Sequence, residues 1–258
     1  MTPRPLNGFH HVTAIASDPR TNIDFYVERV GMRLVKRTVN FDDPHAYHLY
    51  YGDQRGRPGT LMTFFCWPGA PRGRGAAGNI TEVGLRGSRD PGPVTDPDGL
   101  RLSAARGPVS LDSITVTLRE LEPTARMLTE LLGFEAQRDG AFRLGEAILR
   151  VDVKPEAART LMSAGVVHHV AWSVSDDEQQ QRWRTRIAEA GVAVTPARDR
   201  QYFHSIYFNE PGGVLFEIAT DPPGFAIDEP PDHLGEDLRL PPWLEPLRQE
   251  IAAALPAI

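Results

Sequence analysis

The sequence predicts an α+β fold built from repeated modules, each of one strand, one helix and three further strands. The main observation is an internal repeat: the triplet His-His-Val occurs at 10–12 and again at 168–170, and each copy opens the same order of strand-like and helix-like patterns. The glycine and proline content, 23 of each in 258 residues, favours turns and short strands over a helical bundle. A repeat of this length governs the fold prediction.

The first and last modules show the repeat most clearly. In the first, residues 9–16 alternate like a half-buried strand, Asp18 precedes a proline as at a helix start, and Gly31 is placed to end the helix. In the last, a strand covers VVHHVAWSV, Asp176 is the expected helix cap and Gly191 the stop. Later strand-like runs complete both modules, at 46–53, 60–67, 204–210 and 213–219.

Two further modules lie between these. The third has a strand at 110–118, a helix from Pro123 to Gly133 and strands at 141–145 and 147–153, but Asp112 and Ser113 stand where the histidine pairs would be. The second is truncated: a strand at 79–87 is followed by a predicted loop at 88–99 and a run at 100–104, with no helical pattern. Its end resembles that of the last module, because Asp96-Pro97-Asp98-Gly99 parallels Glu210-Pro211-Gly212-Gly213 and Ser103 falls where Glu217 stands.

These patterns predict five segments. They are module 1 at 1–67, a glycine-rich linker with the truncated module 2 at 68–109, module 3 at 110–164, module 4 at 165–220, and a proline-rich tail with a short helix at 221–258.

Composition excludes several classes of protein. The net charge of −6 argues against nucleic acid or an anionic membrane as the main partner, since both attract concentrated positive charge. A single cysteine, Cys66, excludes a disulfide framework and a cysteine-rich zinc site. No apolar stretch approaches the roughly 20 residues that span a bilayer, and the N-terminus does not read as a secretory signal. We therefore expect a cytoplasmic protein.

The repeated histidines predict a metal site. Equivalent positions in modules 1 and 4 would meet in any twofold pairing of these modules, and Glu217 lies inside the apolar run VLFEIA, where a carboxylate needs a partner. Two imidazoles and one carboxylate form the facial triad of non-haem Fe(II) enzymes, which leaves coordination positions open. Strand alternation places only one histidine of each pair on the site face, and alternation alone does not choose between them.

The chain resembles the vicinal oxygen chelate superfamily, which contains glyoxalases and extradiol dioxygenases. Within it, the chain is most similar to the ring-cleaving dioxygenases of the para-hydroquinone type. The stretches that carry the resemblance are HHVTA at 10–14, VKRT at 35–38, YHLYYGD at 47–53, GTLMT at 59–63, VVHHVAW at 166–172 and DRQYFHSIYFNEPGGVLFEIA at 199–219. They cover modules 1 and 4 well and the middle of the chain poorly.

The resemblance implies two-module open barrels and a site between modules 1 and 4. It implies His11, His169 and Glu217 as ligands of Fe(II), with Mn(II) as the alternative metal. It also places five residues around the substrate: His10, His168, Arg200, Tyr207 and Thr13. The implied reaction opens the ring of a hydroquinone or related dihydroxylated aromatic and incorporates both atoms of O2. His45, His48 and His204 are interpreted as structural.

Two alternatives stay open. A glyoxalase-like isomerase or transferase would use the metal as a Lewis acid only, and usually adds a fourth protein oxygen, for which module 1 offers no obvious carboxylate. A resistance-type protein that binds a small aromatic molecule without catalysis would lack the ligand triad, which is present here. The expected partners are a small aromatic substrate and O2, and a homodimer is the favoured assembly.

Overall fold

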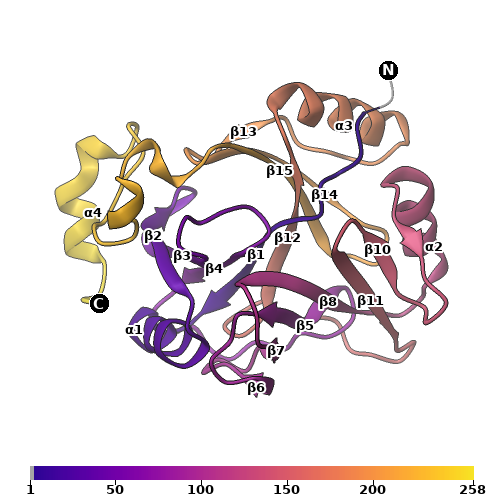
Figure 1. Cartoon of the computed structure of the whole chain (residues 1–258), viewed down its shortest axis with the longest axis horizontal. Coiled ribbons are helices and arrows are strands. Elements are labelled where there is room, and N and C mark those ends of the chain that lie inside the picture. Colours follow the sequence, from indigo (N-terminus) through magenta and orange to yellow (C-terminus); the bar gives the residue numbers. More distant parts are fainter. Residues whose placement is uncertain (1–2) are drawn as a thin grey trace.

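The computed structural model describes residues 3–258 and contains two curled sheets, with the helices at the periphery (Figure 1). The eight-stranded sheet has the order β13-β14-β15-β12-β1-β4-β3-β2, and the seven-stranded sheet the order β6-β7-β5-β8-β11-β10-β9. This confirms the predicted α+β class.

The first sheet is formed by modules 1 and 4. Module 1 contributes β1 (Phe9–Ala16), α1 (Pro19–Ile23), β2 (Arg33–Asn40), β3 (Asp43–Gly52) and β4 (Leu61–Cys66). Module 4 contributes β12 (Val167–Val174), α3 (Asp177–Glu189), β13 (Arg198–Asp199), β14 (Phe203–Asn209) and β15 (Leu215–Pro223). The strands β1 and β12, which carry the histidine pairs, lie antiparallel to each other at the centre of this sheet.

The second sheet is formed by the two remaining repeats. The strands of the truncated repeat are β5 (Asn79–Arg86), β6 (Gly92–Thr95) and β7 (Arg101–Ala105). The other repeat contributes β8 (Ser110–Leu118), α2 (Glu122–Arg126), β9 (Glu135–Ala136), β10 (Phe142–Leu144) and β11 (Ala147–Val153). The central pair β5–β8 is antiparallel, like β1–β12.

All four repeats share one pairing rule. In each, the first strand pairs in parallel with the last strand, as β1 with β4, β12 with β15, β8 with β11 and β5 with β7. The truncated repeat therefore keeps the defining strand pair, although it has lost its helix and one strand. The prediction of a loop at 88–99 is wrong in part, because β6 forms there and pairs with β7.

The predicted helix ends agree with the structure. Asp18 accepts a hydrogen bond from the Thr21 amide, and Asp176 accepts one from the Gln179 amide. Gly31 takes a φ of 90°, a left-handed conformation that ends the helix without a steric penalty. The periodicity did not predict that α1 and α2 each continue as a π-helix, over Asp24–Val30 and Met127–Leu131.

An acidic residue organises the loop before the last strand of a repeat. Oδ1 of Asp96 accepts hydrogen bonds from the amides of Asp98 and Leu100, and the Glu210 carboxylate accepts them from Gly212 and Val214. The sequence parallel between these two loops thus reflects the same hydrogen-bonding pattern. Because Asp96 is buried, its pKa rises from 3.8 to about 6. The charge of Asp98 raises this pKa further, and hydrogen bonds from Leu100 and Gly99 oppose the rise.

This shift predicts the effect of Asp96→Asn on stability. The folded state holds the Asp96 proton more tightly than the unfolded chain, so its contribution to stability is complete below pH 3.8 and is lost as the pH rises through about 6. The amide keeps the Oδ1 acceptor without the charge. We therefore expect the variant to exceed wild type in free energy of unfolding at pH 8 by about 1–3 kcal/mol. Urea unfolding at pH 4.5 and pH 8 checks this, and an equal pH dependence in both proteins would contradict it.

The core runs through the junction between the sheets. Trp172 on β12 is fully buried, and its ring lies 5.1 Å from that of Phe9, 5.0 Å from Phe134 and 5.5 Å from Phe216. These contacts pack the strands of modules 1 and 4 against the end of the helix of the third repeat. The strands that carry the histidine pairs are therefore supported by a buried, closely packed aromatic cluster.

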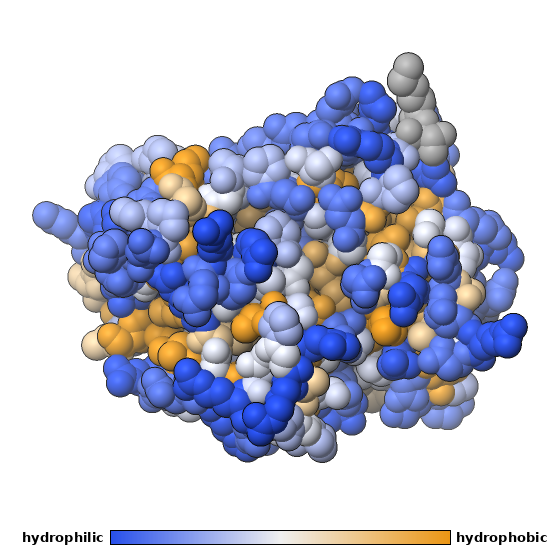
Figure 2. Space-filling view, in the orientation of Figure 1, coloured by the Kyte–Doolittle hydropathy of each residue, from blue (hydrophilic) through white to orange (hydrophobic). Residues whose placement is uncertain are grey.

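The C-terminal tail crosses the outer edge of the first sheet. It carries α4 (Arg248–Ala254), short 3-10 turns at Phe225–Ile227, Pro231–His233 and Glu245–Leu247, and an isolated bridge between Leu238 and Arg37 on β2. Figure 2 shows a mostly hydrophilic face with hydrophobic side chains at its lower left, where these elements lie beside α1 and β2. None of the helices within residues 3–258 combines the length and hydropathy needed to cross a membrane.

Candidate metal centre

Both histidine pairs lie at irregularities of the central strand pair. Along β1 the register passes from Phe9 to His11 while β12 advances by one residue, so His10 is an extra residue. Along β12, His168 is the extra residue in the same way, because Thr13 faces His169 and the next residue of β1 faces Val167. The first histidine of each pair is thus the bulged residue. A β-bulge redirects side chains locally, which corrects the expectation of strict alternation.

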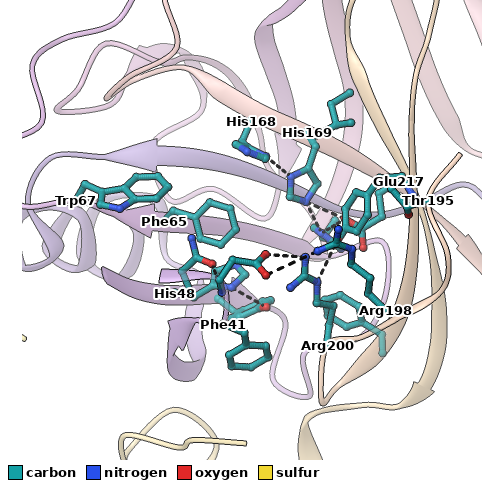
Figure 3. Close-up of a pocket in the computed structure, with 17 residues that line it drawn as sticks. Phe41, His48, Phe65, Trp67, His168, His169, Thr195, Arg198, Arg200 and Glu217 are labelled. Carbon is teal, nitrogen blue, oxygen red and sulfur yellow. Dashed lines mark hydrogen bonds and ion pairs between the residues drawn. The ribbon is translucent and has the colours of Figure 1, made fainter. Parts of the chain in front are cut away.

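The bulges place the rings of each pair in contact. Nδ1 of His10 lies 2.8 Å from Nδ1 of His11, and Nδ1 of His168 lies 2.7 Å from Nδ1 of His169. The second histidines then face each other across the strand pair, with 3.1 Å between Nε2 of His11 and Nε2 of His169. Figure 3 shows His168 and His169 joined in this way, with Glu217 on the adjoining side of the cavity.

Glu217 completes a group of three donors. Oε2 of its carboxylate lies 2.9 Å from Nε2 of His169 and 3.5 Å from Nε2 of His11. The ligand atoms of the three residues lie within 4.8 Å of one another, and all three side chains are buried. Glu217 reaches this position because β15 runs parallel to β12, with Ala171 as its register partner.

The electrostatics of this group fit a metal ion. Burial opposes ionisation of Glu217, but the adjacent imidazoles of His11 and His169 hold the pKa of its carboxyl well below the usual range. Burial lowers the pKa of His169 despite its contact with Glu217. An anionic carboxylate and a neutral imidazole are the forms that bind metals. Oε2 is moreover buried and, within the described part of the chain, has no hydrogen-bond donor that satisfies it. A cation is the partner that such an oxygen lacks.

His10 and His168, both expected near the substrate, differ in position. His168 lines the cavity next to the donor group, whereas His10 does not line it and packs edge to face on Phe203. Burial, together with the charge of the adjacent histidine, lowers the pKa of each to about 3, so both are neutral near pH 7. His10 also bonds to the backbone of Thr220. The geometry therefore makes His10 a support for His11.

Thr13 is also further from the cavity than expected. It is fully buried, does not line the cavity, and its Oγ1 lies 2.7 Å from Oγ1 of Thr63 on β4. His48, which is interpreted as structural from the sequence, lines the cavity, and Tyr50 lies beside it. The period-two spacing of these two residues on β3 was the available signal for their shared face.

Arg200 and Tyr207 both line the cavity and contact each other. Nε of Arg200 donates to the Tyr207 hydroxyl at 3.1 Å, and Nη2 lies 2.9 Å from Oδ2 of Asp42 in the turn between β2 and β3. Burial, and then the charge of Glu217, raises the pKa of Tyr207, so its hydroxyl stays protonated. The sequence did not single out Ser205, which donates to Oε1 of Glu217 at 2.5 Å and fixes the carboxylate.

The cavity itself has a volume of about 430 Å³. Its wall combines polar groups with the aromatic side chains of Phe41, Phe65, Trp67 and Phe203. A flat aromatic molecule fits such a wall, since aromatic rings pack favourably against one another. The tail contributes indirectly, because Trp243 packs edge to face on Phe41 at 5.7 Å.

Comparison with known proteins places the chain in a family. Residues 8–78 and 110–218 match the family model of the Glyoxalase/Bleomycin resistance protein/Dioxygenase superfamily, and the unmatched middle is the truncated repeat. MhqO of Bacillus subtilis, which carries the name of a ring-cleaving dioxygenase, is 40% identical over 96% of this chain and 95% of its own length. The chlorohydroquinone/hydroquinone 1,2-dioxygenase of Sphingobium indicum is 29% identical over 96% of both chains.

Solved structures agree with this placement. A crystal structure described as a dioxygenase from Bacillus subtilis superposes with a TM-score of 0.92 at 35% identity, and covers 99% of this chain and 98% of its own. A glyoxalase I variant from Zea mays, at a TM-score of 0.63 and 15% identity, shares the fold alone. The chain therefore belongs to the glyoxalase/bleomycin resistance protein/dioxygenase superfamily, and its near full-length relatives group it with the ring-cleaving dioxygenases of that superfamily.

Proposed function

We propose that the chain is a non-haem Fe(II)-dependent, extradiol-type dioxygenase that opens the ring of a hydroquinone or a related dihydroxylated aromatic. The observation that carries this proposal is the buried His11–His169–Glu217 group at the wall of a largely aromatic cavity. Two imidazoles and a carboxylate suit Fe(II), with Mn(II) as the alternative, and leave coordination positions for other ligands. The names of the near full-length relatives support the same reaction class.

The protein's own residues supply orientation and protons. With Nε2 of His169 bound to the metal, its Nδ1 would carry the proton and donate to Nδ1 of His168. His168 then carries its own proton on Nε2, so it is a neutral donor at the cavity. Arg200 donates to the oxygen of Tyr207, which leaves the Tyr207 hydroxyl proton free for a substrate oxygen. When bound, Fe(II) would supply the one-electron chemistry that allows O2 to react with an electron-rich ring.

Metal content and oxygen uptake test this proposal. Protein loaded with Fe(II) under anaerobic conditions should hold about one iron per chain and consume oxygen when hydroquinone or chlorohydroquinone is added, with catechol as the comparison substrate. Chelator-treated protein should lose the activity and regain it with Fe(II). A protein that binds one iron but consumes no oxygen with any of these compounds would overturn the proposed function.

A further inference from the structure

A buried chain of hydrogen bonds runs from β1 across β4 to the cavity wall on β3. Oγ1 of Thr13 lies 2.7 Å from Oγ1 of Thr63, which lies 3.0 Å from Nε2 of His48, and Nδ1 of His48 lies 3.0 Å from the Tyr50 hydroxyl. We call these four residues the Thr13–Tyr50 chain. His48 and Tyr50 line the cavity, whereas Thr13 and Thr63 are fully buried behind it.

The direction of this chain follows from counting protons. Each of the three hydroxyls carries one proton, and a neutral imidazole carries one on either nitrogen. Burial, followed by the charges of His11 and His169, lowers the pKa of His48 well below its usual value, so the ring is neutral. Three hydrogen bonds use three of the four protons, which leaves one spare donor. That spare donor belongs to Thr13, to Thr63 or to Tyr50, because the one proton of His48 always lies in a bond of the chain.

Burial decides among these three hydroxyls. Thr63 is the one hydrogen-bond partner that Oγ1 of Thr13 has within residues 3–258, and Thr13 is fully buried. Thr63 is fully buried as well, so a spare proton on either threonine would be a buried, unsatisfied donor, which is costly. At the other end the spare proton faces a cavity that a ligand can enter. The favoured direction is therefore Thr13 to Thr63 to Nε2 of His48, with the His48 proton on Nδ1 donated to the oxygen of Tyr50.

We propose that the Tyr50 hydroxyl donates a hydrogen bond to an oxygen of the bound aromatic substrate, and that His48 is the residue that positions it. This inference rests on the proposed function for the identity of the ligand. Burial and the charge of Glu217 raise the pKa of Tyr50, so its hydroxyl keeps the proton. The arrangement parallels that of Tyr207, whose oxygen accepts from Arg200. Two tyrosines would then offer donors to the oxygens of one ring.

The tautomer of His48 tests the direction of the chain without any turnover. In the full-length chain supplied with diamagnetic Zn(II), long-range 1H–15N spectra of labelled histidine should show His48 protonated on Nδ1, with its signal assigned by loss in His48→Gln. Thr63→Val removes the hydroxyl that donates to Nε2 and should shift the population toward the Nε2-protonated form. Thr63→Ser should restore the wild-type spectrum. Thr38→Val is the matched control, because Thr38 is the register partner of His48 on β2 and its buried hydroxyl has no partner within the described residues.

Kinetics test the contact with substrate. Tyr50→Phe in the Fe(II)-loaded enzyme should lower kcat/KM for hydroquinone by about ten- to a hundredfold, with a raised KM, because a donor to a ring oxygen is lost. Tyr51→Phe is the control, since its hydroxyl donates to Asn22 and Tyr51 does not line the cavity. His48 protonated on Nε2 in the wild type, or equal kinetics for the two tyrosine variants, would overturn the inference. A wild type that consumes no oxygen would instead overturn the proposed function, and the tautomer would still decide the direction of the chain.

Discussion

Glu217→Gln is expected to abolish metal binding and oxygen uptake while the chain stays folded. The substitution removes the one negative charge of the donor group and replaces an oxygen that lies 2.9 Å from Nε2 of His169. Loss of an outer partner of a metal ligand typically costs about 10–100-fold in affinity or activity, and loss of the charged ligand itself should exceed this. Elemental analysis after anaerobic loading and gel filtration measures the first effect, and an oxygen electrode the second.

Asp96→Asn is the matched control for this result. Asp96 is also a buried carboxylate that accepts hydrogen bonds in an interstrand loop, but it lies outside the cavity. The control should keep its iron and its oxygen uptake. A Glu217→Gln protein with full iron content and activity would show that the ligand assignment is wrong.

Lys36→Met is expected to lower the free energy of unfolding by about 3–5 kcal/mol. Lys36 lies on β2 with a fully buried side chain, and its Nζ is 2.6 Å from Oδ1 of Asp228 and in contact with the buried Glu229 carboxylate. Lys36 also anchors the C-terminal tail, because its Nζ donates a hydrogen bond to the Phe225 carbonyl at 3.3 Å. Removal of the cation leaves the almost fully buried Glu229 carboxylate with Arg239, whose Nε lies 3.5 Å from Oε1, as its remaining cation within residues 3–258. Chemical unfolding of the metal-free protein measures the change.

The second lysine of the chain provides the control. Lys154 forms a surface pair with Asp152 at 2.6 Å, and its side chain is 58% exposed. Exposed ion pairs contribute little, so Lys154→Met should change stability by about 0.5 kcal/mol or less. Equal losses for the two variants would contradict the view that the buried cluster anchors the tail. A detached tail should also disturb the cavity, because Phe225 packs edge to face on Tyr50 at 5.0 Å.

Much of the fold could be predicted because the chain repeats itself. The two His-His-Val triplets marked strands that meet at the centre of one sheet, and Asp18 and Asp176 marked the helix starts through local hydrogen bonds that need no tertiary context. The short strand β6 escaped prediction because four residues rich in glycine and proline show no clear alternation. Its formation depends on pairing with β7, a contact that single-segment patterns do not encode.

The candidate site could be predicted only in part, for a related reason. Equivalence between repeats pointed to the histidine pairs and to the isolated acid Glu217, and the structure brings these residues together. Alternation could not choose within each pair because the β-bulges depend on how two distant strands pair. His48 and Ser205 carry no such repeat signal. His48 lines the cavity, and the buried Ser205 contacts Glu217, only once the strands have assembled into the sheet. The sequence likewise predicts Lys36 only as a strand residue, because its partner Glu229 lies far along the chain in the C-terminal tail.

Product analysis of a single substrate tests the central claim most directly. Fe(II)-loaded protein should convert hydroquinone with one O2 consumed per ring, and mass spectrometry should show a ring-opened product that has gained the mass of one O2 molecule. Chelator-treated protein and the Glu217→Gln variant provide the background rate. Formation of benzoquinone, with oxygen consumed but no oxygen atom incorporated, would show that the protein oxidises the ring without cleaving it and would contradict the account.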